Sequence, residues 1–462
     1  MNRALLASAL VFAAGLLLPV AGYGQPYVMD SIDVGGAWVG SMCYNSRADV
    51  VYGRSFSANL FFTIDCATNQ VISQFHVEGP WYGLYDSLDN KAYWTSRSGD
   101  IESVMVVDGT THQRLRAIPV EWAAIPLWDP VADRLWVSCT EANEVVCIDC
   151  RTDSVIAHVP VGAGPLKMHL NTRRRKLYVQ NSDDNSVSVL DLLGGGVRAT
   201  LPAGRLMESG FYSPEQDKYY CDGTDRVSVV DGVRDSVLRY IPLPWRDNVY
   251  AMAGCAVPGL VLFAIFDTNA VWAVDARTDS VVQRVSVGRM PRVMYWSPAT
   301  NLVYVGNGYT DDVSVLTGDG ARLIATLAIG DAPFAFAYST FHHRLYVGHL
   351  NSSMVYVIQD SAVGVREGVG NLTRHDTGLT VRPSVFSRGV AIESDDVGVA
   401  SLVVYSLNGS LIRALQPQRI SKRRYRALWD GRDQRGQETA AGAYVIVTEG
   451  GGQTRTRVVK LR

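Results

Sequence analysis

Tryptophan and arginine residues gather in the short segments between successive apolar runs of this 462-residue chain. An aromatic ring beside a guanidinium group suits a carbohydrate, an aromatic or an anionic ligand, because the ring offers a stacking face and the guanidinium a charged partner. The same bulky side chains could instead fill the space around which the runs pack. The candidate ligand-binding residues are Trp38, Trp81, Trp122, Arg205, Glu208, Trp245, Arg246, Arg289 and Arg292.

Catalytic and metal-binding motifs are sparse by comparison. The sequence contains no Gly-x-Ser-x-Gly, His-Glu-x-x-His, P-loop or EF-hand pattern. His342, His343 and His349 form the one histidine cluster, and we expect surface histidines there, because a metal site needs three or four converging ligands. We therefore predict no catalytic residue, no bound metal and no cofactor.

Seven cysteines lie between Cys43 and Cys255. Cys147 and Cys150 have CxxC spacing, but no second CxxC or histidine pair completes a zinc site, so we expect a structural role. Cys150 follows an Ile-Asp pair, as Cys66 does, which indicates a small residue at a strand end. A disulfide between Cys139 and Cys147 across one hairpin is a further hypothesis for an oxidising compartment.

The apolar runs that must position these residues form a repeat. Its markers are Tyr52, Tyr93, Trp136, Tyr178, Tyr220, Leu262, Tyr304 and Tyr346, separated by 41, 43 and then five times 42 residues. A period near 42 with short, strand-like units is typical of a β-propeller blade, and none of the units shows helical periodicity. Each unit is consistent with four strands, and the third strand alternates apolar and polar residues, as in Val187-Ser-Val189.

The two ends of the array predict how the ring closes. Residues 28–35 match a fourth strand before any first strand has appeared, and the eighth unit stops after its third strand at residues 354–359. The N-terminal strand can therefore complete the last blade, which removes both exposed sheet edges. We predict an all-β chain with eight blades over residues 25–360, with seven blades as the alternative. The segments rich in Trp and Arg then join the fourth strand of one blade to the first of the next and open onto the central channel.

The blade sequence resembles a known repeat family. Residues 177–191 read Leu-Tyr-Val-Gln-Asn and then Val-Ser-Val-Leu-Asp, and similar units end in Val-x-Val-Gly. This pattern is similar to the YVTN family of β-propeller repeats over about residues 27–360. The resemblance implies a secreted or surface propeller. It implies no particular reaction, because that family is related to both lactonase-like and quinoprotein-like propellers.

The N-terminal residues predict export. Arg3 precedes an apolar run from Ala4 to Val20, and small residues follow it up to Gly24. This arrangement is typical of a signal peptide over residues 1–24, and an uncleaved anchor is the alternative. No other stretch reaches membrane-spanning length, so we expect no transmembrane segment in the mature chain. We expect an extracellular or cell-surface location, with the periplasm as the alternative.

Charge divides the mature chain into two parts. Residues 25–370 carry 27 Lys and Arg against 37 Asp and Glu, whereas residues 371–462 carry 15 against 8. The Gly-rich residues 361–379 are interpreted as a linker. About seven short strand candidates in residues 380–462 predict a small immunoglobulin-like β-sandwich. We expect no nucleic-acid partner for an exported chain that is acidic overall.

A motif in the basic part carries a second resemblance. Its residues are Trp429, Gly431, Asp433, Gly436, Gly442 and Tyr444. They resemble the Ig-like domain of flagellar hook-capping proteins and the C-terminal sorting domains of type IX secretion cargo, although the Asn-Pro start of those domains is only partly kept. The resemblance implies sorting or surface attachment through secretion machinery. A purely structural module is the alternative.

Two functions follow from these observations. The first is an exported or cell-surface scaffold without enzymatic activity, which binds a glycan, protein or matrix ligand through the propeller and is delivered or displayed by its C-terminal domain. The alternative is a secreted propeller enzyme of lactonase-like or quinoprotein-like type. Such an enzyme should collect carboxylates, histidines or a cofactor motif on the channel segments. Tryptophan and arginine predominate there instead, which favours binding.

Overall fold

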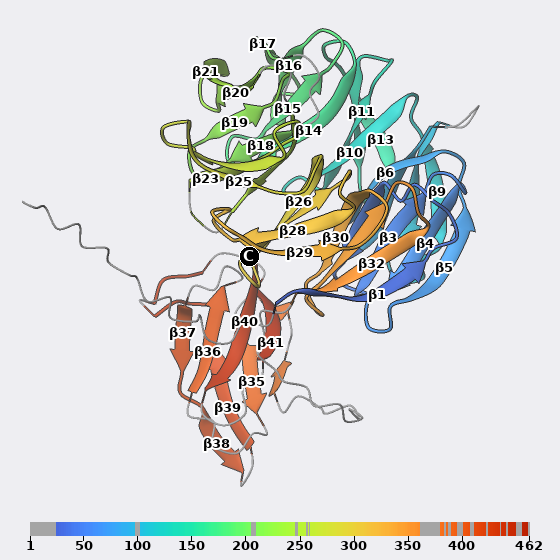
Figure 1. The fold of residues 1–462 in the computed structure, drawn as a ribbon. Coiled ribbons are helices and arrows are strands. Elements are labelled where there is room, and N and C mark those ends of the chain that lie inside the picture. The colour runs from blue at the N-terminus through green and yellow to red at the C-terminus, as the bar shows by residue number, and fades with distance from the viewer. Residues whose placement is uncertain are drawn as a thin grey trace, which may run out of the picture.

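The fold was analysed in a computed structural model (Figure 1). It describes residues 25–360 apart from 98–101, 205–208, 245–247, 256 and 258. In the C-terminal part it describes residues 379–460 apart from 383–384, 387–389, 395–400, 407–410, 422–423, 435, 440–441 and 450–454. The predicted signal peptide and nearly all of the predicted linker lie outside the described residues. Those residues form strands and turns, and no helix among them has the length and hydropathy to cross a membrane.

Eight four-stranded antiparallel sheets follow one another along residues 27–359 and form a β-propeller (Figure 1). The first strand of each blade contacts the first strands of both neighbouring blades, so these strands are innermost. The blades are β2–β5 (41–76), β6–β9 (80–119), β10–β13 (123–160), β14–β17 (165–202), β18–β21 (210–242), β22–β25 (249–286), β26–β29 (291–328), and β30–β32 (333–359) with β1, here numbered 1 to 8.

The N-terminal strand closes the ring, as predicted. β1 (Tyr27–Asp33) pairs antiparallel with β32 (Met354–Gln359), so that Ile32 lies opposite Val355. Ile32 and Val355 then share one buried cluster with blade 1 residues such as Phe62. The prediction of eight blades is confirmed, and the seven-bladed alternative is wrong.

The second strand of every blade carries the marker residue of the repeat, which is aromatic in seven blades and Leu262 in blade 6. All eight marker side chains are buried, seven of them fully. Neighbouring blades pack their faces together through these residues: Tyr178 stacks on Tyr219 of the next blade with ring centroids 4.4 Å apart. The repeat was visible in the sequence because each blade must bury both of its faces against its neighbours.

Basic residues at the start of four second strands fasten one blade to the next. Lys91, the first residue of β7 (Lys91–Ser96), donates from Nζ to the Cys150 carbonyl oxygen at 2.7 Å and to Asp153 at 2.9 Å in blade 3. Equivalent contacts into the following blade are made by Lys176, Lys218 and Arg344. We call these contacts the interblade latches.

The C-terminal part contains two small sheets, which is consistent with an immunoglobulin-like sandwich. Their strand orders are β33-β35-β39-β38 and β34-β41-β40-β36-β37. Their bounds are β33 (Leu379–Arg382), β34 (Val385–Phe386), β35 (Val390–Ser394), β36 (Ser401–Ser406), β37 (Leu411–Leu415), β38 (Gln418–Ser421), β39 (Arg424–Trp429), β40 (Gly442–Glu449) and β41 (Arg455–Lys460). The sequence predicted most of these strands. It predicted about seven strands, whereas the described residues of this part form nine.

Trp429 fills the core between these sheets. Its side chain is fully buried against Leu402 and Tyr444 of the opposite sheet, and its Nε1 donates to the Arg432 carbonyl oxygen at 2.9 Å. Gly431 and Gly436 have φ of +74° and +77°, a backbone region that favours glycine. The side chain of Asp433 accepts from the Gln437 N–H at 2.8 Å and closes the turn. Gly442 is the first residue of β40.

Two expectations about cysteine and histidine are wrong. All seven cysteines are free thiols, and Cys139 and Cys147 lie opposite Glu144 and Trp136 respectively. Cys139 belongs to the cluster on one face of blade 3 and Cys147 to the cluster on the other face, so they cannot form a disulfide. Among the histidines, His349 is fully buried rather than exposed, with Nδ1 on the Met354 carbonyl oxygen at 3.0 Å.

The interblade latches predict that removing a buried cation lowers the stability of the fold much more than removing an exposed one. Lys176→Met removes a buried ammonium group 2.5 Å from Asp235, whose carboxylate is 9% exposed and would keep only the half-exposed Arg198, 3.3 Å away, as its counter-charge. We expect the free energy of unfolding in urea to fall by about 3 to 5 kcal/mol. Arg277→Met is the control, because the Arg277 side chain is 72% exposed and its ion pair with Asp275 is solvated. Equal effects of the two substitutions would contradict the role of the latch.

Candidate functional site

The turns that enter the first strands share an unusual backbone position. Gly79 and Gly164 occupy it with φ of +50° and +66°. Three other blades place large side chains in the same left-handed region: Trp38 at +62°, Trp122 at +56° and Met290 at +62°. A residue with a Cβ atom is strained there, and the strain costs about 1–2 kcal/mol per residue. Trp38 and Trp122 nevertheless occupy these strained positions, and their side chains are 41% and 37% exposed.

Side chains from the b–c turns, which join the second strand of a blade to its third, fix these strained positions. The Met290 N–H donates to Asn269 Oδ1 at 2.9 Å. The Gly164 N–H donates to Asn143 Oδ1, also at 2.9 Å. Each asparagine belongs to the preceding blade, so the end of the ring that carries these turns is held from blade to blade. We call this end of the ring the binding face.

An aromatic cluster with an arginine at its centre forms on the binding face of blades 1 and 2. The rings of Trp38 and Phe56 have centroids 4.7 Å apart, and those of Phe56 and Trp81 5.9 Å apart. The Arg54 guanidinium lies over Phe56 and Trp81, at 5.5 and 5.6 Å from their centroids. Arg97 approaches Trp81 as well, at 5.9 Å. The sequence named Trp38 and Trp81 as candidates, and the structure brings both into one cluster.

Arg54 is the member of this cluster that sequence reasoning missed. It belongs to β3 (Val50–Ser55), and its guanidinium occupies the space beside Gly40, where an added Cβ would lie 2.8 Å from Nη2. The residue is 3% exposed, and burial lowers the pKa of its guanidinium to about 10. Within the described residues, its Nε and Nη1 have no hydrogen-bond partner and it forms no ion pair. A signal was present, because no other blade has a basic residue two positions after its marker; the next two blades have Thr95 and Ser138 there.

A second arginine repeats this environment on blades 6 to 8. Arg292 is the second residue of β26 (Pro291–Ser297), and its guanidinium lies 5.3 Å from the Tyr250 ring and 5.4 Å from the Phe334 ring. Its Nε is buried and has no hydrogen-bond partner in the described part of the chain. Between blades 2 and 4, which are not neighbours, Lys167 Nζ lies 5.1 Å from the Tyr82 ring, so these two first-strand side chains meet inside the ring of blades. Arg54, Arg292 and Lys167 thus each lie over aromatic rings.

The remaining candidates are dispersed. Trp122 belongs to a separate turn, and its backbone N–H donates to the side chain of Glu102. Arg289 is exposed and lies over Tyr309 at 5.8 Å. Arg205, Glu208, Trp245 and Arg246 lie outside the described residues.

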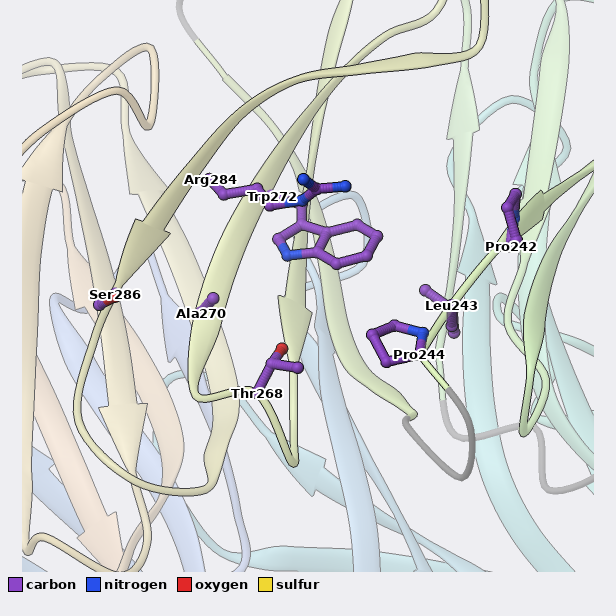
Figure 2. A pocket seen from close by; sticks show the side chains of 8 residues that line it. All are labelled: Pro242, Leu243, Pro244, Thr268, Ala270, Trp272, Arg284 and Ser286. Atoms are coloured by element: carbon purple, nitrogen blue, oxygen red, sulfur yellow. The ribbon is translucent and has the colours of Figure 1, made fainter.

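A hollow of about 530 Å³ lies between blades 5 and 6 (Figure 2). Pro242 and Pro244 face Trp272 across it, and the Arg284 guanidinium stacks over the Trp272 ring at 4.5 Å. The Trp272 ring is thus largely covered. In contrast to Arg54, the hollow offers no cation that is both buried and without a partner among the described residues, so we place the candidate site at the binding face.

The closed ring defines the chain as an eight-bladed β-propeller protein with two small β-sheets after the ring. Comparison with family models found no match, and comparison with curated proteins found no similar sequence. Function is therefore inferred from the geometry and charge of the residues at the binding face.

The strained position in blade 3 gives a prediction about stability. We expect Trp122→Gly to be more stable than Trp122→Ala by about 1 kcal/mol, because only glycine relieves the positive φ. Val282, an exposed residue of β25 (Ser280–Ser286), is the control. There the alanine variant should be more stable by about 0.5–1 kcal/mol, since glycine weakens a strand. Urea unfolding measures both differences, and the same sign at both positions would contradict the strain.

Proposed function

We propose that the propeller is an exported binding protein without catalytic activity, whose ligand is an acidic saccharide held at the binding face. The observation that carries the proposal is the buried Arg54 guanidinium. A buried charge without a partner is costly, and a ligand carboxylate would compensate it. Arginine presents parallel N–H groups that match a carboxylate, so the pair would form two charge-assisted hydrogen bonds.

The aromatic rings around Arg54 support the saccharide as the ligand class. Trp38 is partly exposed and packs against Phe56, and Trp81 lies at the inner edge beside them. A sugar ring stacks on an aromatic face with its apolar C–H groups, while its substituents reach neighbouring polar side chains. A uronic acid combines that ring with the carboxylate that Arg54 requires.

The location and delivery of the protein are part of the same proposal. The N-terminal segment supports export, and the repeat supports membership of the YVTN type of propeller. The motif around Trp429 supports an Ig-like C-terminal domain that sorts the protein to, or displays it on, the cell surface through secretion machinery. In this proposal the propeller faces the ligand and the C-terminal domain faces the cell.

The role of Arg54 is tested by calorimetric titration with oligogalacturonate and with a neutral oligosaccharide of equal length. We expect binding of the acidic oligomer only, and a loss of at least about tenfold in affinity for Arg54→Met, since a hydrogen bond to a charged group contributes about 1.5–3 kcal/mol. Arg277→Met, which removes an arginine far from the site in the sequence, should bind like the unaltered protein. Equal affinity for the neutral oligomer, or full affinity of Arg54→Met, would contradict the proposal.

Delivery is tested separately by truncating the chain after residue 360. We expect the truncated protein to be exported but lost from the surface fraction of the source cells, and to keep its affinity for the acidic oligomer. Immunoblots of the surface, periplasmic and medium fractions measure the distribution. Surface delivery equal to that of the full chain would show that the C-terminal domain is only a structural module.

A further inference from the structure

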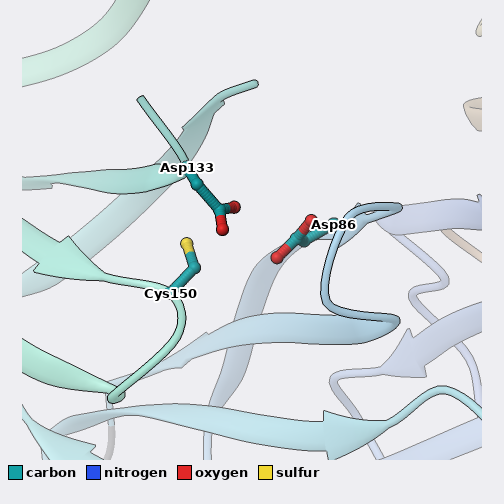
Figure 3. A group of neighbouring side chains, drawn as sticks. All are labelled: Asp86, Asp133 and Cys150. Carbon is teal, nitrogen blue, oxygen red and sulfur yellow. The ribbon is translucent and has the colours of Figure 1, made fainter. Parts of the chain in front are cut away.

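A cluster of two carboxylates and a thiol lies at the end of the ring opposite the binding face. It consists of Asp86, Asp133 and Cys150, and their ligand atoms all lie within 4.8 Å of one another (Figure 3). Asp86 ends β6 (Pro80–Asp86) in blade 2. Asp133 precedes β11 (Arg134–Cys139) and Cys150 follows β12 (Glu144–Asp149), both in blade 3. The cluster therefore bridges the gap between two blades.

Asp86 provides an observation independent of the clustering. Its side chain is fully buried, and its Oδ1 accepts the N–H of Leu88 at 2.7 Å and that of Asp89 at 3.3 Å. Its Oδ2 is buried and has no hydrogen-bond partner among the residues that the structure describes, and the carboxylate points toward Asp133 (Figure 3). Burial raises the pKa of Asp86 to about 6. An acceptor aimed into the cluster is thus left unsatisfied.

The groups around the cluster do not neutralise it. Asp133 Oδ1 accepts from Trp128 Nε1 at 3.4 Å, and the Arg151 Nε lies 3.5 Å from Oδ2, on a side chain that is 75% exposed. Lys91 points its ammonium group at the Cys150 carbonyl oxygen and at Asp153. Burial raises the pKa of the Cys150 thiol as it does that of Asp86, and the negative charges of Asp133 and Asp89 raise both further.

The next two gaps of the ring show how the same positions are neutralised there. One gap further on, Asp129 occupies the position of Asp86 and is also fully buried, but Arg175 stands where blade 3 has Asp133 and forms a two-pronged ion pair with it. In the next gap, Asn171 donates to Asp217 at 3.2 Å, and Arg174 neutralises Asp217. The gap between blades 2 and 3 has a second carboxylate where its neighbour has the cation.

We propose that Asp86, Asp133 and Cys150 bind a divalent cation of the zinc class, which supplies the positive charge that this gap lacks. A thiolate with two carboxylates is a donor set for Zn²⁺, whose sites combine sulfur and oxygen ligands. The Cys150 thiol proton leaves to solvent when the metal binds. Three protein ligands leave a fourth position, which water or Asp89 would fill. The bound ion fastens blade 2 to blade 3, as Arg175 fastens blade 3 to blade 4.

Cobalt provides a spectroscopic test on the full-length protein. The reduced protein is treated with chelator, dialysed and titrated with Co²⁺, which gives near-ultraviolet charge-transfer absorption when a thiolate binds it. We expect this band to saturate at one Co²⁺ per chain and to disappear when Zn²⁺ is added. Zn²⁺ should also raise the temperature of unfolding of the chelated protein.

Two variants identify the ligands, and a third is the control. Cys150→Ser should abolish the band, and Asp86→Asn should weaken Co²⁺ binding at least tenfold. Cys147→Ser is the matched control, because Cys147 belongs to the same CxxC but is buried in the apolar core on the opposite face of the blade, away from Asp86 and Asp133. It should keep the full band.

Asp133→Arg tests the same idea without a metal. It copies the arrangement of Asp129 with Arg175, so we expect a higher temperature of unfolding than that of the chelated protein and no further rise with Zn²⁺. The proposal is overturned if no thiolate band forms, if the band survives Cys150→Ser, or if Asp133→Arg responds to Zn²⁺ as the unaltered chain does.

Discussion

The pairing of β1 with β32 is the interaction on which the whole ring depends. Each blade has two apolar faces and can bury them only against its neighbours, so an open array would expose one face at each end. Closing the ring in the last blade buries Ile32 and Val355 in one cluster with residues of blade 1. It also fixes the curvature of the ring, and hence the distance at which Lys167 of blade 4 meets Tyr82 of blade 2.

Between the blades, a common apolar packing is combined with polar contacts that differ from gap to gap. The latches of Lys91 and Lys176 donate to the same backbone carbonyl position of the following blade. The turns at the same end of the ring differ from gap to gap, because they place an ion pair, an amide or two carboxylates between the blades. The repeat therefore sets the geometry, and individual gaps are free to vary in charge. Both proposed sites are places where a buried charged side chain has atoms without a hydrogen-bond partner among the described residues: Arg54 at the binding face and Asp86 at the opposite end.

The sequence predicts the ring well and its sites poorly, for one physical reason. The marker at Tyr178 and its counterparts recur because burial constrains every blade alike, and the missing fourth strand of the last unit identifies the closing strand. The environment of Arg54 depends on the absence of a side chain at Gly40 and on a ring from the next blade, and no local pattern reveals this. The same is true of Asp86 and Cys150, which come together only after two blades have packed.

The closing strand also orders events during synthesis. Ile32 leaves the ribosome long before Val355, its partner 323 residues away, so β1 must wait unpaired until almost the whole ring has been made. An unpaired strand is a template for aggregation, and charged residues within such a strand oppose it. β1 carries Asp30 and Asp33 among its seven residues. These two carboxylates protect the segment that the growing chain has to keep available longest.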